Sequence, residues 1–321
     1  MFKRMLAALL CVGAGLIPGA SAQDFPTQPI KLVIPFGPGG GTDIVGRMLA
    51  EYMQNKLGKP VVVENKPGAG GILGNEFIAN AAPDGYTIGL MTAGQLIAAV
   101  TRKQMRYDTL TAFTPIGMVA TASLAIVARA DFPASNVQEL IAFAKAQPDK
   151  VVFASPGFAA TQHFAGEMFK QSANVSLLHV PYKTTPEALN AVVGKHADIL
   201  FDTVSAVLAH VESGQLKAIA VTGKERFPAL PNVPTALESG LAGYDVTTWY
   251  GMFGPKGIPA PIVARLNQVL NEALSDADVR KRLERAGVIV KSSTPEEFGA
   301  FLANEYQRFA RTREAAGIQQ Q

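Results

Sequence analysis

Short β-branched runs alternate with amphipathic helical patterns along most of the chain, and this alternation limits the fold more than any other feature. Six runs have the composition of strands, and most of them precede a segment with helical periodicity. These runs are Ile30–Ile34, Val61–Val63, Tyr86–Met91, Val151–Phe153, Asp198–Phe201 and Lys217–Val221. The alternation predicts an α/β protein with mainly parallel sheets flanked by helices.

Two helical segments carry clear local signals. Between Asp43 and Leu57 the apolar residues fall on one helical face, so this face is expected to pack against a sheet. Near the other end, Thr294-Pro295-Glu296-Glu297 has the sequence of a capping box with proline at the first helical position. A helix is therefore predicted to begin there.

The N-terminus has the layout of a cleavable secretory signal. Lys3 and Arg4 precede an apolar run that ends at Ile17, and small residues follow from Ala20 to Ala22. The run is shorter than the roughly 20 residues that a membrane-spanning helix needs. We expect residues 1–22 to be removed when the protein is exported.

Composition excludes several classes of site. Cys11 is the single cysteine and lies in the expected signal, so the mature chain has no disulfide, thiolate metal site or cysteine nucleophile. The four histidines are spaced too widely for a helical metal pair, and we expect no metal and no cofactor. Loss of Lys3 and Arg4 leaves 27 basic against 26 acidic residues, a net charge of +1, which is too small to hold nucleic acid.

Three glycine-containing turns follow predicted strands. The first, Pro35–Thr42, contains four glycines, the second is Lys66–Gly74, and the third is Ser155-Pro156-Gly157 before a helix near Thr161. Glycine leaves backbone amides open to a ligand at the positive end of a helix. Any one of these turns could be a tight connection that binds nothing. Together they predict the two walls of an anion-binding cleft.

Enzyme motifs are incomplete. Thr42 and Leu73 stand where a dinucleotide fingerprint has its third glycine. Ser155 lies on a strand-to-helix turn, but Phe153 replaces the first glycine of a nucleophile elbow. We interpret Ser155 as a hydrogen-bond donor. The alternative function is an α/β hydrolase or dehydrogenase that acts on a small acid.

Several other side chains near the turns have two interpretations. Asp43 and Asp202 could be favoured at helix starts by the dipole, or could face the cleft and accept from a ligand ammonium or hold waters. His163 could donate to a carboxylate or be structural. The apolar candidates to cover a ligand, which could equally be core residues, are Phe36, Phe158 and Trp249.

Five motifs occur in order along the chain: Pro35–Asp43, Glu64–Gly71, Pro83–Thr87, His179–Lys183 and Trp249–Gly251. Together they resemble the tripartite tricarboxylate transporter substrate-binding receptors, the Bug proteins, over essentially the whole mature chain. The resemblance implies a two-lobed periplasmic binding protein of type II, a Venus flytrap without a catalytic step. It also implies the membrane subunits of a tripartite tricarboxylate transporter as partners.

In that family the glycine-rich loops and the opposing Ser/Gly turn hold a ligand carboxylate, partly through waters. The resemblance therefore implies these ligand-binding residues: Phe36, Gly39, Gly40, Asp43, Gly70, Gly71, Ser155, Gly157 and Thr161. Asp202 is our candidate for tuning the distal end of the site. One departure is Lys183-Thr184, where members commonly have Lys-Gly.

Polar, proline-containing stretches at 107–115 and 225–234 are the expected crossings between lobes. We predict lobe 1 from residues 23–107 and 226–321, and lobe 2 from 108–225. The expected function is capture of a small carboxylate between the lobes by a monomeric receptor. Dicarboxylates, acidic amino acids and aromatic acids all fit, because backbone donors recognise a carboxylate generically.

Overall fold

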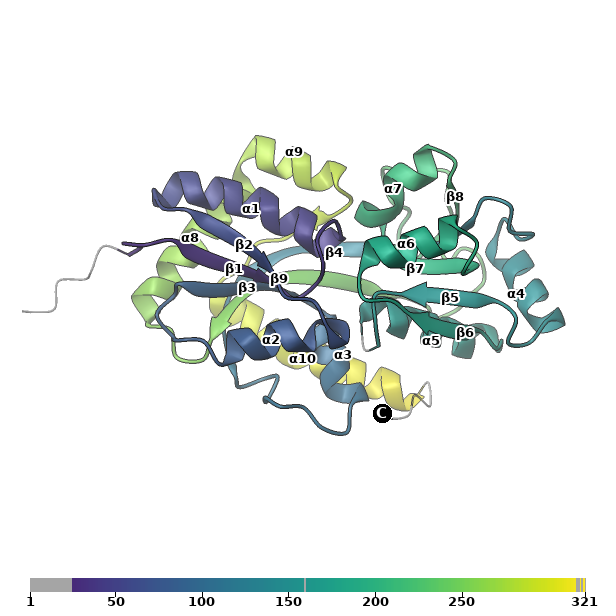
Figure 1. Cartoon of the computed structure of the whole chain (residues 1–321), viewed down its shortest axis with the longest axis horizontal. Coiled ribbons are helices and arrows are strands. Elements are labelled where there is room, and N and C mark those ends of the chain that lie inside the picture. Colours follow the sequence, from purple (N-terminus) through teal and green to yellow (C-terminus); the bar gives the residue numbers. More distant parts are fainter. Residues whose placement is uncertain (1–24, 159, 316–317, 319, 321) are drawn as a thin grey trace, which may run out of the picture.

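The computed structural model describes residues 25–158, 160–315, 318 and 320. The expected signal, residues 1–22, lies outside this part of the chain. Two lobes lie side by side, and the strands β4 and β9 run between them (Figure 1). The α/β class and the two-lobed architecture are both as predicted. No described helix is long and apolar enough to cross a membrane.

The first lobe contains a sheet with strand order β2-β1-β3-β9-β4-β10. Its strands are β1 (Ile30–Ile34), β2 (Val61–Asn65), β3 (Thr87–Thr92), β9 (Thr247–Pro255), β10 (Ile289–Val290) and the first half of β4 (Phe113–Arg129). One face packs on α1 (Gly41–Leu57), α8 (Ala260–Ser275) and α9 (Ala277–Arg285). The other face packs on α2 (Ile72–Ala79), α3 (Gly94–Thr101) and α10 (Pro295–Ala315). A short turn of 3₁₀ helix, η1 (Ala69–Gly71), precedes α2.

The second lobe has strand order β6-β5-β7-β4-β8. Its own strands are β5 (Val152–Ser155), β6 (Leu178–Pro181), β7 (Ile199–Thr203) and β8 (Leu216–Val221). Helices α4 (Val137–Ala146) and α5 (Thr161–Ala173) cover one face, and α6 (Thr185–Val193) and α7 (Val204–Glu212) cover the other. Each lobe is therefore a three-layer α/β/α unit.

The sheets are mixed and not mainly parallel, which corrects the sequence prediction. The pairs β1–β2, β1–β3, β5–β6 and β5–β7 are parallel, but every pair made by β4 or β9 is antiparallel. The sequence analysis missed β4 and β9. The apolar run Leu124–Ala128 of β4 does not alternate, because its even-numbered residues pack into one core and its odd-numbered residues into the other.

The chain changes lobe within β4. Up to Ser123 this strand pairs with β9 of the first lobe, and from Leu124 it pairs with β7 of the second. The chain returns to the first lobe after the predicted crossing at 225–234, because Phe227, Tyr244 and Val246 still pack in the cores of the second lobe.

Both local helix predictions hold. The helix predicted from Asp43 to Leu57 is α1. At the start of α10, the Thr294 amide donates to Glu297 Oε2 at 2.9 Å and the Glu297 amide donates to Thr294 Oγ1 at 3.1 Å. These two bonds are the reciprocal pair of a capping box.

Candidate functional site

Four helices begin at one small cavity between the lobes. The cavity is bordered by the first residues of α1, α5 and α6, and by Thr203, which caps α7. The lining residues are Phe36, Gly40, Gly41, Thr42, Thr92, Thr161, Gln162, Thr185, Thr203, Thr248 and Tyr250. Three of the ten predicted site residues, Phe36, Gly40 and Thr161, are among them.

The first glycine-rich turn forms the wall of the first lobe. Gly40 is the N-cap of α1 and has extended backbone. A Cβ on the next residue, Gly41, would lie 2.7–2.8 Å from the hydroxyl oxygens of Thr203, Ser205 and Tyr250. Only glycine therefore allows the start of α1 to approach these hydroxyls.

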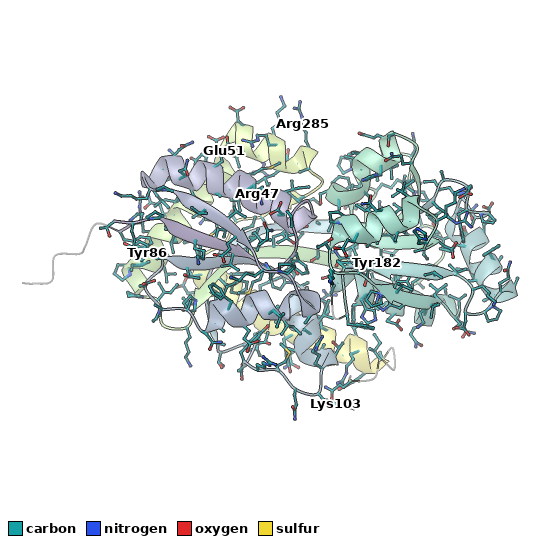
Figure 2. All side chains as sticks on the ribbon, viewed as in Figure 1. Arg47, Glu51, Tyr86, Lys103, Tyr182 and Arg285 are labelled. Carbon is teal, nitrogen blue, oxygen red and sulfur yellow. The ribbon has the colours of Figure 1, made fainter. Side chains whose placement is uncertain are left out.

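Asp43 organises this turn and does not line the cavity. Its Oδ2 accepts from the Gly39 amide at 3.0 Å and from Arg47 Nε at 2.9 Å, while its Oδ1 accepts from Asn65 Nδ2 at 2.9 Å. Burial raises the pKa of Asp43, but the bonds from Arg47, Gly39 and Asn65 outweigh it and leave the pKa below its usual value. Figure 2 shows Arg47 on α1 in the first lobe.

The second glycine-rich turn contacts the opposite lobe. Gly70 has φ of +70°, and a Cβ there would overlap the carbonyl oxygen of Phe158. Gly71, with φ of +97°, lies against the ring of Phe36. A Cβ on Gly157 would in turn lie 3.3 Å from the Gly70 amide nitrogen. These glycines allow the two lobes to meet beside the cavity but do not line it.

Ser155 is hydrogen-bonded within its own lobe. Its Oγ lies 2.7 Å from His179 Nε2, and it also bonds the backbone of Gly157 at 3.2 and 3.3 Å. A serine and histidine at this distance could be a nucleophile and base, but Ser155 is fully buried and His179 Nδ1 has no partner among the described residues. Burial, with a smaller effect of His163, lowers the pKa of His179 to about 3, which makes it a poor base.

His163 belongs to an aromatic stack beside this turn and does not line the cavity. Its ring centroid lies 4.3 Å from that of His179, which in turn stacks on Phe153 at 4.6 Å. Burial lowers the pKa of His163 to about 4, although Glu167 opposes the effect. Phe158 packs edge-on against both histidine rings and is half-exposed.

The start of α6 explains the departure at Lys183-Thr184. Thr184 is the N-cap of this helix, and its hydroxyl accepts from the Glu187 amide at 3.3 Å. A Cβ on Gly37 would overlap the methyl group of Thr184. Thr184 therefore caps the helix and packs against a glycine of the opposite lobe. Figure 2 shows the neighbouring Tyr182 in the second lobe.

Asp202 lies just behind the wall of the second lobe. Its Oδ1 accepts from Gln162 Nε2 at 2.9 Å and from the Thr203 amide at 2.7 Å, whereas Oδ2 has no described partner of normal hydrogen-bond geometry, although the Thr185 hydroxyl lies nearby. Burial raises the pKa of Asp202 to about 6, although these hydrogen bonds oppose the effect. Asp202 therefore changes from its protonated to its ionised form near pH 6.

The connecting strand β9 contributes residues that the sequence analysis missed. Tyr250 is buried, and its hydroxyl lies beside Thr203 and Ser205 without a partner of normal hydrogen-bond geometry. Thr248 lies 3.5 Å from Thr161 through their hydroxyl oxygens. Thr92 and Thr203 could have been found, because each ends a strand at the sheet edge where ligands bind in α/β folds. Tyr250 lies within the motif Trp249–Gly251, but neither it nor Thr248 could be placed at the cavity, because β9 was not predicted.

The three aromatic side chains that were candidates to cover the ligand lie in different places. Phe36 lines the cavity, Phe158 lies on the histidine stack, and Trp249 packs with Phe253, Phe298 and Phe301. In the described part of the chain, no group of three or more His, Cys, Asp and Glu residues could hold a metal ion.

The cavity is suited to an anion without any cationic side chain in its lining. Each helix N-terminus carries about half a positive charge and free amides. Four such termini and several hydroxyl groups meet here. The arrangement can therefore bind a carboxylate through hydrogen bonds and dipoles.

Comparison with known proteins agrees with this arrangement. The profile of the family described as "Tripartite tricarboxylate transporter family receptor" matches residues 45–318. Protein BugT of Bordetella pertussis is 33% identical over 311 residues, which are 96% of this chain and 95% of BugT.

Two solved structures have the same fold over nearly the whole chain. The periplasmic binding protein BugD is 40% identical, with a TM-score of 0.90, and the match covers 92% of this chain and all of BugD. MatC from Rhodopseudomonas palustris with bound malate is 33% identical, with a TM-score of 0.85, and the match covers 89% of this chain and 99% of MatC.

Proposed function

The chain belongs to the tripartite tricarboxylate transporter receptor family, and on this premise we propose that it captures a small carboxylate in the periplasm. Receptors of this family bind a substrate and are not enzymes. The alternative that the protein is a hydrolase or dehydrogenase is therefore rejected. After capture, the receptor would deliver its ligand to the membrane subunits of a tripartite tricarboxylate transporter.

The observation that carries the proposal is the convergence of four helix N-termini on a cavity without cationic side chains. A carboxylate there would accept from the free amides of α1, α5 and α6 and from nearby hydroxyls. Phe36, Gly40 and Thr161 would contact the ligand. The other predicted residues would position the turns, as Asp43 does for the first one.

The proposed ligand is a small acid with a second polar group. Asp202 Oδ2 and the Tyr250 hydroxyl are buried polar atoms without partners at one side of the cavity, and such groups are costly unless bonded. A hydroxyl on the ligand would donate to Asp202 Oδ2, and a second carboxylate would accept from the Tyr250 hydroxyl, directly or through water. The bound malate of MatC has both groups.

Entry of such a ligand requires the lobes to separate. The volume of the cavity is about 20 Å³, which is room for one or two waters. A small diacid is several times larger. We propose that the lobes, formed by residues 25–123 with 247–315 and by 124–246, open and close about β4 and β9.

A thermal-shift screen tests the proposal directly. The ligand-stripped, refolded protein from residue 23 would be screened with malate, succinate, aspartate, glutamate, benzoate and NAD⁺. A ligand at 100 times its dissociation constant adds about 2.7 kcal/mol of stability, so a binding acid raises the midpoint clearly. A shift with NAD⁺ and with none of the acids would refute the proposal.

A matched pair of glycine variants shows whether binding occurs in this cavity. Gly41→Ala places a methyl group among the three hydroxyls. Gly299→Ala, on α10, places a methyl group 3.7 Å from Cγ of Pro115 on β4. The stabilising acid should lose its effect on Gly41→Ala and keep it on Gly299→Ala. An equal response of both variants would place the binding site elsewhere.

A further inference from the structure

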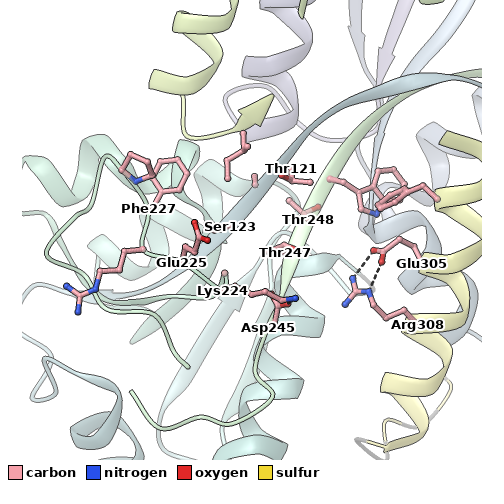
Figure 3. A pocket seen from close by; sticks show the side chains of 17 residues that line it. Thr121, Ser123, Lys224, Glu225, Phe227, Asp245, Thr247, Thr248, Glu305 and Arg308 are labelled. Carbon is pink, nitrogen blue, oxygen red and sulfur yellow. Dashed lines mark hydrogen bonds and ion pairs between the residues drawn. The ribbon is translucent and has the colours of Figure 1, made fainter. Parts of the chain in front are cut away.

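A second groove, which we call the rear groove, lies along the connecting strands β4 and β9 (Figure 3). Its volume is about 520 Å³. One wall belongs to the first lobe and includes Ile289 of β10 with Glu305 and Arg308 of α10. The other wall belongs to the second lobe and includes residues 223–228 and Asp245. The groove is thus bordered by both lobes.

The same strands form the floor of the groove and of the ligand cavity. On β9, Tyr250 borders the cavity, Thr247 and Trp249 border the rear groove, and Thr248 borders both. Because successive side chains of a strand point to opposite faces, the two spaces lie on opposite faces of β9. A rotation of the lobes about this strand that widens the ligand cavity would narrow the rear groove.

The walls of the rear groove carry complementary charges. On α10, Arg308 Nε and Nη2 donate to Glu305 at 2.6 and 2.8 Å. On the opposite wall, Lys224 Nζ lies 3.8 Å from Asp245 Oδ2. Figure 3 shows these two pairs facing each other across the groove. Narrowing the groove would bring Arg308 and Glu305 of the first lobe towards the oppositely charged Asp245 and Lys224 of the second.

Asp245 and Arg308 are the candidates for an ion pair between the two walls. Both also line an adjoining groove between α5 and α10, so they are neighbours at the point where the two grooves meet. Asp245 Oδ1 is buried and has no partner among the described residues. Burial lowers the pKa of Arg308, but Glu305 and, more weakly, Asp245 outweigh it and raise the pKa.

We propose that the rear groove is a latch: it closes when the ligand cavity opens, and Arg308 then pairs with Asp245 to hold the lobes apart. The inference rests on the proposed opening of the lobes but not on the identity of the ligand. A latch of this kind sets affinity, because a receptor that is closed only part of the time binds more weakly in proportion to its closed fraction.

The test measures the distance between the lobes without any ligand. Spin labels on Gln54→Cys in α1 and Glu212→Cys in α7 report this distance by pulsed electron–electron double resonance. Protein made from residue 23 has no other thiol. Ile289→Trp adds a bulky side chain at a half-exposed position in the rear groove. The matched control is Leu178→Trp, a half-exposed position on β6 away from the groove.

The latch predicts a mixed or long distance for the parent protein and a shift to the short distance for Ile289→Trp. The ratio of closed to open molecules should rise about five-fold, the effect of about 1 kcal/mol, and Leu178→Trp should match the parent. A parent that is already wholly closed, or an Ile289→Trp distribution equal to the parent's, would overturn the latch.

A charge variant decides the matter if Ile289→Trp does not fold. Asp245→Asn keeps the side-chain shape and removes the proposed partner of Arg308. It should raise the closed fraction about two-fold at low salt, as expected for a partly exposed ion pair, and have no effect at 1 M salt. No change at low salt would refute the latch. A ligand screen without hits would not affect these distances, so the latch and the proposed ligand class fail separately.

Discussion

Replacing Asp202 with asparagine gives a direct test of the electrostatics at the cavity wall. Asp202 is fully buried, and burial raises its pKa from 3.8 to about 6. Because the folded pKa lies above the unfolded one, the stability that Asp202 contributes is fully present below about pH 3.8 and is lost as the pH rises through 6. Above pH 6, the ionised side chain therefore opposes folding.

The size of the effect follows from the two pKa values. They differ by about two units, and each pKa unit corresponds to about 1.4 kcal/mol, so the ionised carboxylate costs about 3 kcal/mol at pH 8. Asparagine cannot ionise, and its Oδ1 can still accept from Gln162 and Thr203. Asp202→Asn should therefore be about 3 kcal/mol more stable than the parent at pH 8 and less than about 1 kcal/mol more stable at pH 4.

Urea unfolding at pH 4 and pH 8 measures both differences, and Asp43→Asn serves as the matched control. The pKa of Asp43 is lowered by its bonds to Arg47, Gly39 and Asn65 in spite of burial. Its contribution is therefore present above pH 3.8 and is lost as the pH falls through the lowered pKa. Asp43→Asn should cost about 1.5–3 kcal/mol at pH 8. A stability gain for Asp202→Asn that is absent at pH 8, or equal at both pH values, would refute the reasoning.

Substitutions at three further positions have definite expected outcomes. Ser155→Ala should cost about 1–3 kcal/mol in urea unfolding, because it leaves His179 Nε2 buried without its partner; a neutral result would contradict the structural role of the pair. Thr294→Ala should cost about 1 kcal/mol through loss of the cap of α10, and Thr294→Ser should not. Gly70→Ala should weaken binding of the stabilising acid about ten-fold, as measured by calorimetry. The reason is that its methyl group would overlap the Phe158 carbonyl and hinder closure of the lobes. An unchanged affinity would show that the lobes need not meet at Gly70.

The helix starts around the site were visible in the sequence to different degrees. The α1 turn was found because a strand, four glycines and an apolar helical face follow one another within Ile30–Leu57. The capping box at Thr294 was found because all its atoms come from four consecutive residues. Strand β4 was missed because Leu124–Ala128 is buried on both faces and therefore lacks the alternation that marks a half-buried strand.

By itself the sequence determined the fold class, the presence of glycine-rich turns at strand ends and the family, since these depend on local spacing and on motif order. Only the tertiary structure decided which groups share the cavity. Thr92, Thr161, Thr203 and Tyr250 are far apart in the chain and meet because four helix starts converge at the connecting strands. The Asp43 carboxylate accepts hydrogen bonds within its own loop, whereas one carboxylate oxygen of Asp202 has no described partner of normal hydrogen-bond geometry. Side-chain direction depends on packing against the opposite lobe, which no local pattern encodes.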